Sequence, residues 1–359
     1  MSVLSVNCIS IGFYPDEGDS GGTKSYLSHL NTALSTSWPP ITPRPCPIIT
    51  TVGWYAQTYP NETFTGSQLL PLVDDLKCSY TLSHVPFIYE ASVMPFQSWA
   101  GYTPSNNTKA REIAHAISTL IDRSRISCTE YAISEVRLRF GHEMNYYISS
   151  GLYPSSTDAS NPGLDYGTAF DQVALACRSL PSPYKERIKM FWCPNIASTS
   201  TDALQEYQTY LPSLEYVDYV GIDYYCPAPG CLDSGDFVKK MRILHDKYCS
   251  EWRPFILGET GLHYDEREAG GIEAKLKWLQ VVTGKEVKRE LRWMRGVSWF
   301  NYEKDRDYRL IWVRPEEKGC NDPFVGWVER RMDSEHTSKE DRDGAGGKVK
   351  KFLKTLIAN

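Results

Sequence analysis

The sequence predicts one α/β domain that folds as a (β/α)8 TIM barrel, and three observations support this prediction. Eight short runs rich in β-branched and aromatic residues alternate with segments of helical periodicity. The length of 359 residues accommodates one such barrel with long loops. No Gly-x-Gly-x-x-Gly loop follows the first run, where Gly21 and Gly22 stand alone. An open doubly wound sheet is therefore the less favoured alternative.

The predicted strands are short and mostly apolar. In chain order they cover residues 9–14, 48–54, 85–91, 134–141, 187–194, 216–225, 254–259 and 296–301. Between them, apolar residues recur every three or four positions, which is the spacing of a helix that packs one face on a sheet. The clearest helical patterns cover residues 107–123 and 272–282. The single barrel domain is predicted to cover residues 1–359.

The C-terminal part of the chain has a different composition. Residues at about 304–346 are predicted to form a long charged loop, because 330–347 contains many charges and glycine but no periodic apolar residues. One apolar stripe among lysines follows, formed by Val349, Phe352, Leu353 and Leu356. We interpret this stripe as the last barrel helix; a helix lying on a membrane surface is the alternative.

The charge balance bears on possible partners. A net charge of −5 and a pI near 5.9 argue against binding to nucleic acid, because a surface that contacts phosphates needs excess positive charge. No apolar run approaches the roughly 18 residues of a membrane span. We therefore predict neither a nucleic-acid partner nor a membrane span; the oligomeric state is not readable from the sequence.

The N-terminal residues bear on localisation. They show no positively charged segment followed by an apolar one, and the first predicted strand begins by Ile9. We predict a cytoplasmic protein, or a secreted one if this N-terminus is processed or truncated. Ten cysteines at scattered spacings favour mostly reduced thiols over disulfides. Asn61 and Asn106 begin glycosylation sequons, which often arise by chance.

Two glutamates occur where predicted strands run out into loops. Glu143 follows the fourth strand in the segment Arg-Phe-Gly-His-Glu-Met-Asn (139–145), and Glu259 ends the seventh strand in Gly-Glu-Thr-Gly (258–261). The carboxyl ends of parallel barrel strands meet at one face, so both carboxyl groups are expected to face one cavity. One carboxyl group that stays protonated and one that stays ionised can together cleave a glycosidic bond.

Neighbouring residues are candidates for setting the two protonation states, and four of them are also predicted to bind substrate: His142, Arg139, Asn145 and Tyr225. Burial or a facing carboxylate raises the pKa of a carboxyl group, and Glu143 is flanked by His142 and Asn145. Hydrogen bonds from Tyr225 and Arg139 would keep Glu259 ionised. Arg139 is a better candidate than Arg137 because it lies nearer the loop. For His142, a hydrogen-bonded histidine below the barrel rim is the alternative interpretation.

Four motifs in chain order resemble glycoside hydrolase family 26, whose members are retaining endo-β-mannanases, lichenases and β-1,3-xylanases on a (β/α)8 barrel. They cover residues 139–145, 219–225, 258–261, and 297–301 followed by 304–309. The resemblance implies that Glu143 is the acid/base and Glu259 the nucleophile. It also implies that His142 and Tyr225 line the subsite of the reacting sugar and that Trp299 forms its stacking floor.

Further aromatic residues are candidates for the substrate groove. Trp192 and Tyr147 are weaker candidates for outer subsites, since flat rings match the apolar faces of sugars. Packing in the core or rim is the alternative for Trp192 and Trp299. Where the mannanases usually continue with glycine and a Trp-rich sequence, this chain has Tyr146, Tyr147 and Ile148. The rim of the groove therefore differs from that of the family.

Other chemistries have weak support. His142 and Glu143 do not begin a zinc-protease motif, because residue 146 is Tyr. Cys226 and Cys231 could be half a metal site, but no second pair accompanies them, and a loop disulfide or free thiols are the alternatives. No Gly-x-Ser-x-Gly elbow lies near a strand end. We therefore predict no metal and no cofactor.

The sequence-based prediction is a retaining β-glycoside hydrolase that acts on a β-linked oligo- or polysaccharide of the mannan, glucan or xylan type. Retention predicts that the two carboxyl groups lie about 5 to 5.5 Å apart. The alternative is a repurposed or inactive barrel that binds a carbohydrate or another small molecule.

Overall fold

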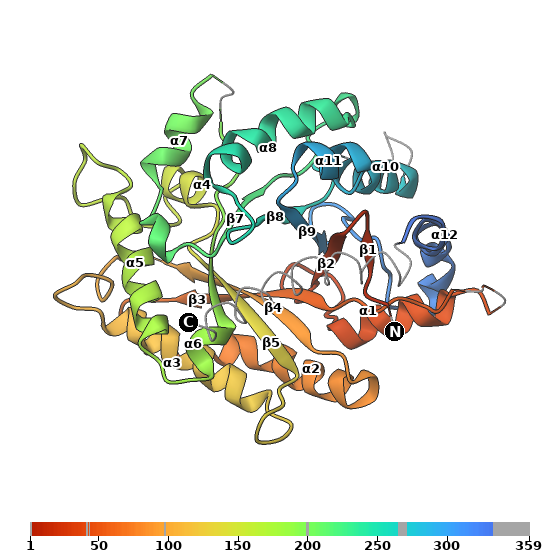
Figure 1. The fold of residues 1–359 in the computed structure, drawn as a ribbon, viewed down its shortest axis with the longest axis horizontal. Coiled ribbons are helices and arrows are strands. Elements are labelled where there is room, and N and C mark those ends of the chain that lie inside the picture. Colours follow the sequence, from red (N-terminus) through yellow and green to blue (C-terminus); the bar gives the residue numbers. More distant parts are fainter. Residues whose placement is uncertain are drawn as a thin grey trace, which may run out of the picture.

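A computed structural model describes residues 2–332 except 41, 43, 97, 199–200 and 265–270. Eight parallel strands form a closed barrel, because each pairs with the next and β2 also pairs with β9. In Figure 1 the strands lie at the centre and most helices lie around them. The barrel strands are β2 (Ile9–Pro15), β3 (Thr51–Thr58), β4 (Phe87–Pro95), β5 (Ile133–Phe140), β6 (Ile188–Trp192), β7 (Tyr219–Asp223), β8 (Phe255–Thr260) and β9 (Met294–Asn301).

The closed barrel confirms the predicted fold class, and each predicted strand overlaps an observed one. One further strand, β1 (Ser5–Val6), was not predicted. It pairs antiparallel with the start of β2. The turn between them consists of Asn7 and Cys8, both with positive φ, as in tight two-residue hairpin turns. A strand of two residues is too short to show an alternating pattern in the sequence.

The helices follow the predicted alternation. Helix α3 covers nearly all of the predicted 107–123 and buries its apolar stripe, and α10 coincides with 272–282. The α-helices are α1 (Leu27–Ser37), α2 (Leu70–Ser83), α3 (Thr108–Arg123), α4 (Met144–Ser149), α5 (Leu164–Arg178), α6 (Tyr184–Arg187), α7 (Ala203–Thr209), α8 (Ser234–Tyr248), α10 (Ile272–Val282), α11 (Lys285–Glu290) and α12 (Asp322–Arg331). Short 3₁₀ helices are η1 (Ser67–Leu69), η2 (Leu214–Tyr216), η3 (Pro229–Cys231) and η4 (Pro315–Asn321). No helix within the described ranges is long and apolar enough to cross a membrane.

The predicted charged loop at about 304–346 is wrong for residues 315–331, because they form η4 and α12. Helix α12 buries Phe324, Val325, Trp327 and Val328 on one face. It packs against α10 and α1. The charged residues on the other face of α12 interrupt this short apolar stripe in the sequence, so the helix was not predicted. The part of the predicted loop beyond residue 332, and the predicted last helix with its stripe, lie outside the described residues.

The barrel interior contains a layer of charged and polar side chains. Arg137 of β5 donates to Glu90 of β4 at 3.0 Å, and Ser298 of β9 donates to the same carboxylate at 2.7 Å. Strands β4 and β9 are not neighbours in the sheet, so these bonds cross the interior. Side chains alternate along a strand, and therefore Arg139, two residues after Arg137, also points inward. Arg139 lies one layer nearer the carboxyl ends of the strands.

Candidate active site

Arg139 is the centre of the buried ionic cluster at the carboxyl ends of the strands. Its Nη1 donates to Oε1 of Glu259 at 2.8 Å, and its Nη2 donates to Asp223. Arg139 and Asp223 are completely buried, and Glu259 is 5% exposed. The cluster connects β5, β7 and β8 across the barrel. One guanidinium thus shares its charge between two carboxylates.

A β-bulge directs Glu259 into this cluster. Ile222 pairs with Leu257 and Asp223 with Glu259, so Gly258 has no partner on β7. A Cβ atom at residue 258 would lie 2.5 Å from Oδ1 of Asp223 and 2.5 Å from Sγ of Cys193. Only glycine leaves room for the carboxylate of Asp223 here. The bulge and the missing side chain together bring the two carboxylates to one guanidinium.

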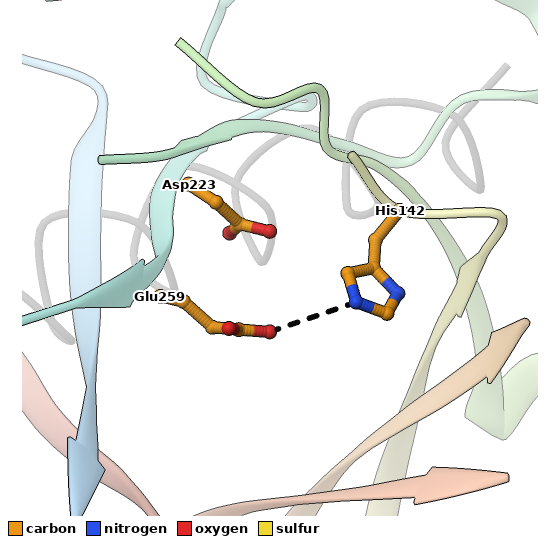
Figure 2. Close-up of side chains that lie close together, drawn as sticks. All are labelled: His142, Asp223 and Glu259. Atoms are coloured by element: carbon orange, nitrogen blue, oxygen red, sulfur yellow. Dashed lines mark ion pairs between the residues drawn. The ribbon is translucent and has the colours of Figure 1, made fainter. Parts of the chain in front are cut away.

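Both oxygens of Glu259 are engaged. Oε1 accepts from Arg139, and Oε2 accepts a hydrogen bond of 3.0 Å from the hydroxyl of Tyr225. Nε2 of His142 lies 3.9 Å from Oε1. Figure 2 shows His142, Asp223 and Glu259 pointing into the same space, with the contact between His142 and Glu259 dashed. The two predicted donors to Glu259, Tyr225 and Arg139, are the ones that the structure contains.

Glu143 lies just after β5 in a different environment. Its backbone is left-handed, with φ of 53°, and its amide donates to the carbonyl of Cys193 at 2.8 Å. A left-handed backbone is strained in a glutamate, and such strain is common at functional sites. Its side chain is 8% exposed and accepts a 2.5 Å hydrogen bond from Nδ2 of Asn195. The turn thus points a nearly buried carboxyl group into the barrel mouth.

Burial is the main reason that the pKa of Glu143 is raised to about 7, and the negative charge of Glu259 is the second reason. Hydrogen bonds from Asn195 and Tyr147 oppose this shift without cancelling it. A carboxyl group with this pKa is largely protonated below neutral pH and can donate a proton. Glu143 and Glu259 are therefore distinguished by their surroundings, since only Glu259 receives a direct hydrogen bond from a cation.

His142 is neutral in this site. Burial and the nearby charge of Arg139 hold the pKa of its imidazole well below the usual value. Its ring contacts Tyr55, with ring centroids 5.7 Å apart, and meets the ring of Tyr147 edge-on at 5.9 Å. Its Nδ1 is buried and has no hydrogen-bond partner among the described residues. This nitrogen is a suitable partner for a hydroxyl group of a ligand.

Asn145 acts on Asn195 rather than on the cavity. Its Oδ1 accepts from the backbone amide of Asn195 at 2.9 Å. Its Nδ2 donates to the carbonyl of Asn195 at 3.1 Å and to Glu206 at 2.6 Å. These bonds occupy the side-chain amide of Asn145, which we had predicted to bind substrate. The structure corrects this prediction: Asn145 holds the residue that hydrogen-bonds to Glu143.

The two tryptophans predicted to contact substrate are also corrected. Trp299 is completely buried, and its indole nitrogen donates to the carbonyl of Tyr308 at 2.8 Å. Trp192 is also completely buried, and its ring packs on Tyr248 of α8. Both point outward to the helix layer because side chains alternate along a strand. Phe300, the next residue of β9, points inward instead and packs on Tyr225 with centroids 5.9 Å apart.

Three residues of the site were missed by the sequence analysis. Asp223 ends β7 inside the motif at 219–225, and this position was a usable signal. Asn195 follows β6, where the sequence shows only a Pro-Asn pair after an apolar run. Tyr55 of β3 contacts both His142 and Tyr14 through its ring. These contacts join residues far apart in the chain, so local pattern does not reveal them.

His142, Asp223 and Glu259 form the one group of potential metal ligands found in the described part of the chain. Their ligand atoms all lie within 4.8 Å of one another. Arg139 already donates to both carboxylates of the group. Its guanidinium supplies there the positive charge that a metal ion would supply. Cys226 and Cys231 are both free thiols, and Cys226 donates to the carbonyl of Ala228.

Solved structures show the same fold. The catalytic domain of a family 26 endo-β-1,4-mannanase from Bacillus sp. JAMB-750 matches with a TM-score of 0.60 and 14% identity, covering 92% of each chain. The barrel has the fold of family 26 glycoside hydrolases. The modular endo-β-1,4-mannanase of Cellulomonas fimi gives a TM-score of 0.58 at 14% identity, over 88% of this chain and 70% of the other.

A second family shares this architecture. A broad-specificity family 5 endoglucanase from an uncultured bacterium matches with a TM-score of 0.55 and 9% identity, covering 92% of this chain and 96% of the other. No protein-family profile and no curated protein sequence matches this chain. The resemblance inferred from the four motifs is therefore supported by the fold, at a sequence identity of 14%. These three structural neighbours are glycoside hydrolases, and at identities of 9 to 14% they share the fold of this chain.

Proposed function

We propose that this protein is a retaining β-glycoside hydrolase with Glu259 as nucleophile and Glu143 as acid/base. The observation that supports this proposal most strongly is the difference between the two glutamates. Glu143 has a pKa near 7 in a largely buried position, whereas Glu259 accepts hydrogen bonds from Arg139 and Tyr225. A retaining mechanism needs one protonated and one ionised carboxyl group.

In the first step, Glu259 attacks the anomeric carbon while Glu143 donates its proton to the departing glycosidic oxygen. The C–O bond to the leaving sugar breaks, and a covalent bond to Oε1 or Oε2 of Glu259 forms. In the second step, Glu143 accepts a proton from a water molecule, which attacks the anomeric carbon and releases Glu259. The charge of Glu259 thus disappears in the first step and returns in the second.

The same loss of charge gives Glu143 its second role. The carboxylate of Glu259 raises the pKa of Glu143, and the covalent intermediate removes that carboxylate. The pKa of Glu143 then falls, so Glu143 loses its proton to the leaving group and remains ionised as a base for water. The substrate class we propose is a β-linked oligo- or polysaccharide of the mannan, glucan or xylan type, supported by the mannanases and endoglucanase of similar fold.

The test begins with a screen of aryl β-glycosides and β-linked oligosaccharides. Glu259→Ala should reduce turnover of any cleaved substrate by several orders of magnitude, because no covalent intermediate forms. Azide should restore turnover of an aryl glycoside and give a glycosyl azide of inverted anomeric configuration, which NMR identifies. Near wild-type activity of Glu259→Ala would exclude Glu259 as nucleophile. Carbohydrate binding without any turnover would favour a barrel that binds but does not cleave.

A further inference from the structure

We propose that Cys193 is a positioning residue that holds both catalytic glutamates in place, Glu143 through its carbonyl oxygen and Glu259 through its thiol. This inference rests on the proposed function and assigns a further residue to the same site. Cys193 directly follows β6 and is 1% exposed. Side chains alternate along a strand, so its thiol points into the barrel as the ring of Phe191 does.

The thiol of Cys193 belongs to the ionic cluster around Arg139. Its Sγ donates to Oδ1 of Asp223 at 3.1 Å and accepts from Nη2 of Arg139 at 3.6 Å. Oδ2 of the same carboxylate accepts from Arg139, so both oxygens of Asp223 have a partner. The carboxylate therefore cannot rotate without losing a hydrogen bond. The thiol thus fixes the orientation in which Asp223 binds Nη2 while Nη1 donates to Glu259.

The thiol is a donor because it stays protonated. Burial, and then the negative charge of Asp223, raises the pKa of Cys193 well above its usual value. A thiol is a weak donor to a neutral acceptor, but an ionised acceptor makes the hydrogen bond stronger. Burial also raises the pKa of Asp223, and the pairing with Arg139 and the hydrogen bond from Cys193 oppose that rise. The thiol thus helps to keep Asp223 ionised.

The backbone of the same segment holds the acid/base. The carbonyl of Cys193 accepts from the amide of Glu143 at 2.8 Å, and Asn195 donates to the side chain of Glu143. Between them, the carbonyl of Pro194 accepts from the amide of Asp223 at 2.9 Å. This short segment therefore joins the end of β5 to the end of β7. The carbonyl and the thiol of one residue contact both sides of the catalytic centre.

Packing leaves the thiol little freedom to turn away from Asp223. Cys193, Phe191 and Ile256 form one buried apolar cluster. On another side, a Cβ atom at residue 258 would lie only 2.5 Å from Sγ, so the thiol lies against the backbone of Gly258. A serine hydroxyl would fit this space and keep a donor, whereas alanine would remove it.

The charges around Glu143 determine what loss of the thiol does. Among the described residues, the titratable groups that act on Glu143 are three charged residues and three tyrosines, namely Arg139, Asp223, Glu259, Tyr147, Tyr153 and Tyr225. Burial raises the pKa of each tyrosine, so all three stay neutral, as does His142. Without the thiol, Asp223 binds a proton more readily, because its ionised form loses a hydrogen bond. The positive charge of Arg139 then acts more strongly on Glu143 and lowers its pKa.

The test uses two variants that change only the thiol. Cys193→Ala removes the donor, and Cys193→Ser keeps one. On the substrate found in the activity screen, Cys193→Ala should lower kcat about 3- to 10-fold and leave KM within about 2-fold, because the buried thiol acts through the catalytic groups. The alkaline limb of its pH–rate profile should move to lower pH, and Cys193→Ser should restore both properties. A wild-type kcat and pH profile in Cys193→Ala, or an equal defect in Cys193→Ser, would overturn the inference.

Cys177→Ala is the matched control, because it also removes a buried thiol. Cys177 lies on α5 and is 2% exposed. Helix α5 belongs to the layer outside the barrel (Figure 1). This variant should keep the wild-type kcat and pH profile. An equal change in Cys177→Ala and Cys193→Ala would mean that the effect comes from loosened packing, and would overturn the inference.

Unfolding measurements separate this inference from the proposed function, because they need no substrate. Glu143→Gln is made in the wild type and in Cys193→Ala, and the stability difference that it causes is measured from about pH 4 to about pH 8. This difference should grow less with pH in the Cys193→Ala background, because the pKa of Glu143 is lower there. Such a result supports the inference even if no glycoside is cleaved. Turnover that depends on Glu259, with equal growth in both backgrounds, overturns the inference and leaves the hydrolase proposal intact.

Discussion

Replacing Glu143 by glutamine should make the protein more stable, and the gain should depend on pH. The carboxyl group of Glu143 has a pKa of about 7 in the folded protein, against an ordinary value of 4.5. The folded protein therefore holds this proton more tightly than the unfolded chain does. Stability from this group is complete below about pH 4.5 and is lost as the pH rises to about 7.

The size of the effect follows from the same two values. Their difference corresponds to a loss of about 3 kcal/mol of unfolding free energy between acidic and alkaline pH. Glutamine does not titrate, so Glu143→Gln should avoid this loss. The variant minus wild-type difference should grow by about 3 kcal/mol between pH 4 and pH 8. Most of the growth should occur between the two pKa values.

The assay is denaturant unfolding of both proteins at pH 4, 5, 6, 7 and 8. Glu316→Gln is the control, because Glu316 is an exposed residue of η4. Its difference from the wild type should vary with pH by less than about 0.5 kcal/mol. A pH-independent difference for Glu143→Gln would refute the reasoning that burial and Glu259 raise the pKa of Glu143. A difference that shrinks with rising pH would refute it more directly.

The remaining predictions concern catalysis and the buried side chains. On any cleaved substrate, kcat/KM should fall as the pH rises above about 7, because Glu143 loses the proton it must donate; a pH–rate profile measures this. Trp299→Phe should lower stability by about 2 kcal/mol but leave KM unchanged, since Trp299 is buried among helices; denaturation and kinetics test the two parts.

The barrel could be predicted from the sequence because each strand has a local pattern. Apolar runs of five to nine residues mark the strands of a buried parallel sheet. In such runs both faces are apolar, so the pattern does not show which side chains point inward. This ambiguity explains the errors at Trp192 and Trp299, where the neighbouring Phe191 and Phe300 point inward instead. A shift of one residue exchanges the two faces of a strand.

Arg139 could have resolved that ambiguity. A charged residue in an apolar strand must find partners, and only the interior near the catalytic end offers two carboxylates. This reasoning fixes the inward face of β5, whereas the sequence analysis chose Arg139 only because it lies nearer the loop than Arg137 does. The same reasoning does not apply to β6 or β9, because their charged residues, Lys189 and Arg295, lie near the amino ends of the strands, away from the catalytic end. The carboxylate partners themselves lie 84 and 120 residues away from Arg139.

The ionic cluster also explains why two glutamates of the same chemistry differ. Arg139 donates directly to Glu259 but not to Glu143, although its charge opposes the raised pKa of Glu143. Asp223 shares that guanidinium and is itself so buried that its pKa is raised well above the usual value. Its pairing with Arg139 limits how much positive charge reaches Glu143. Removing Asp223 would therefore lower the pKa of Glu143 and move the alkaline limb of the pH–rate profile to lower pH.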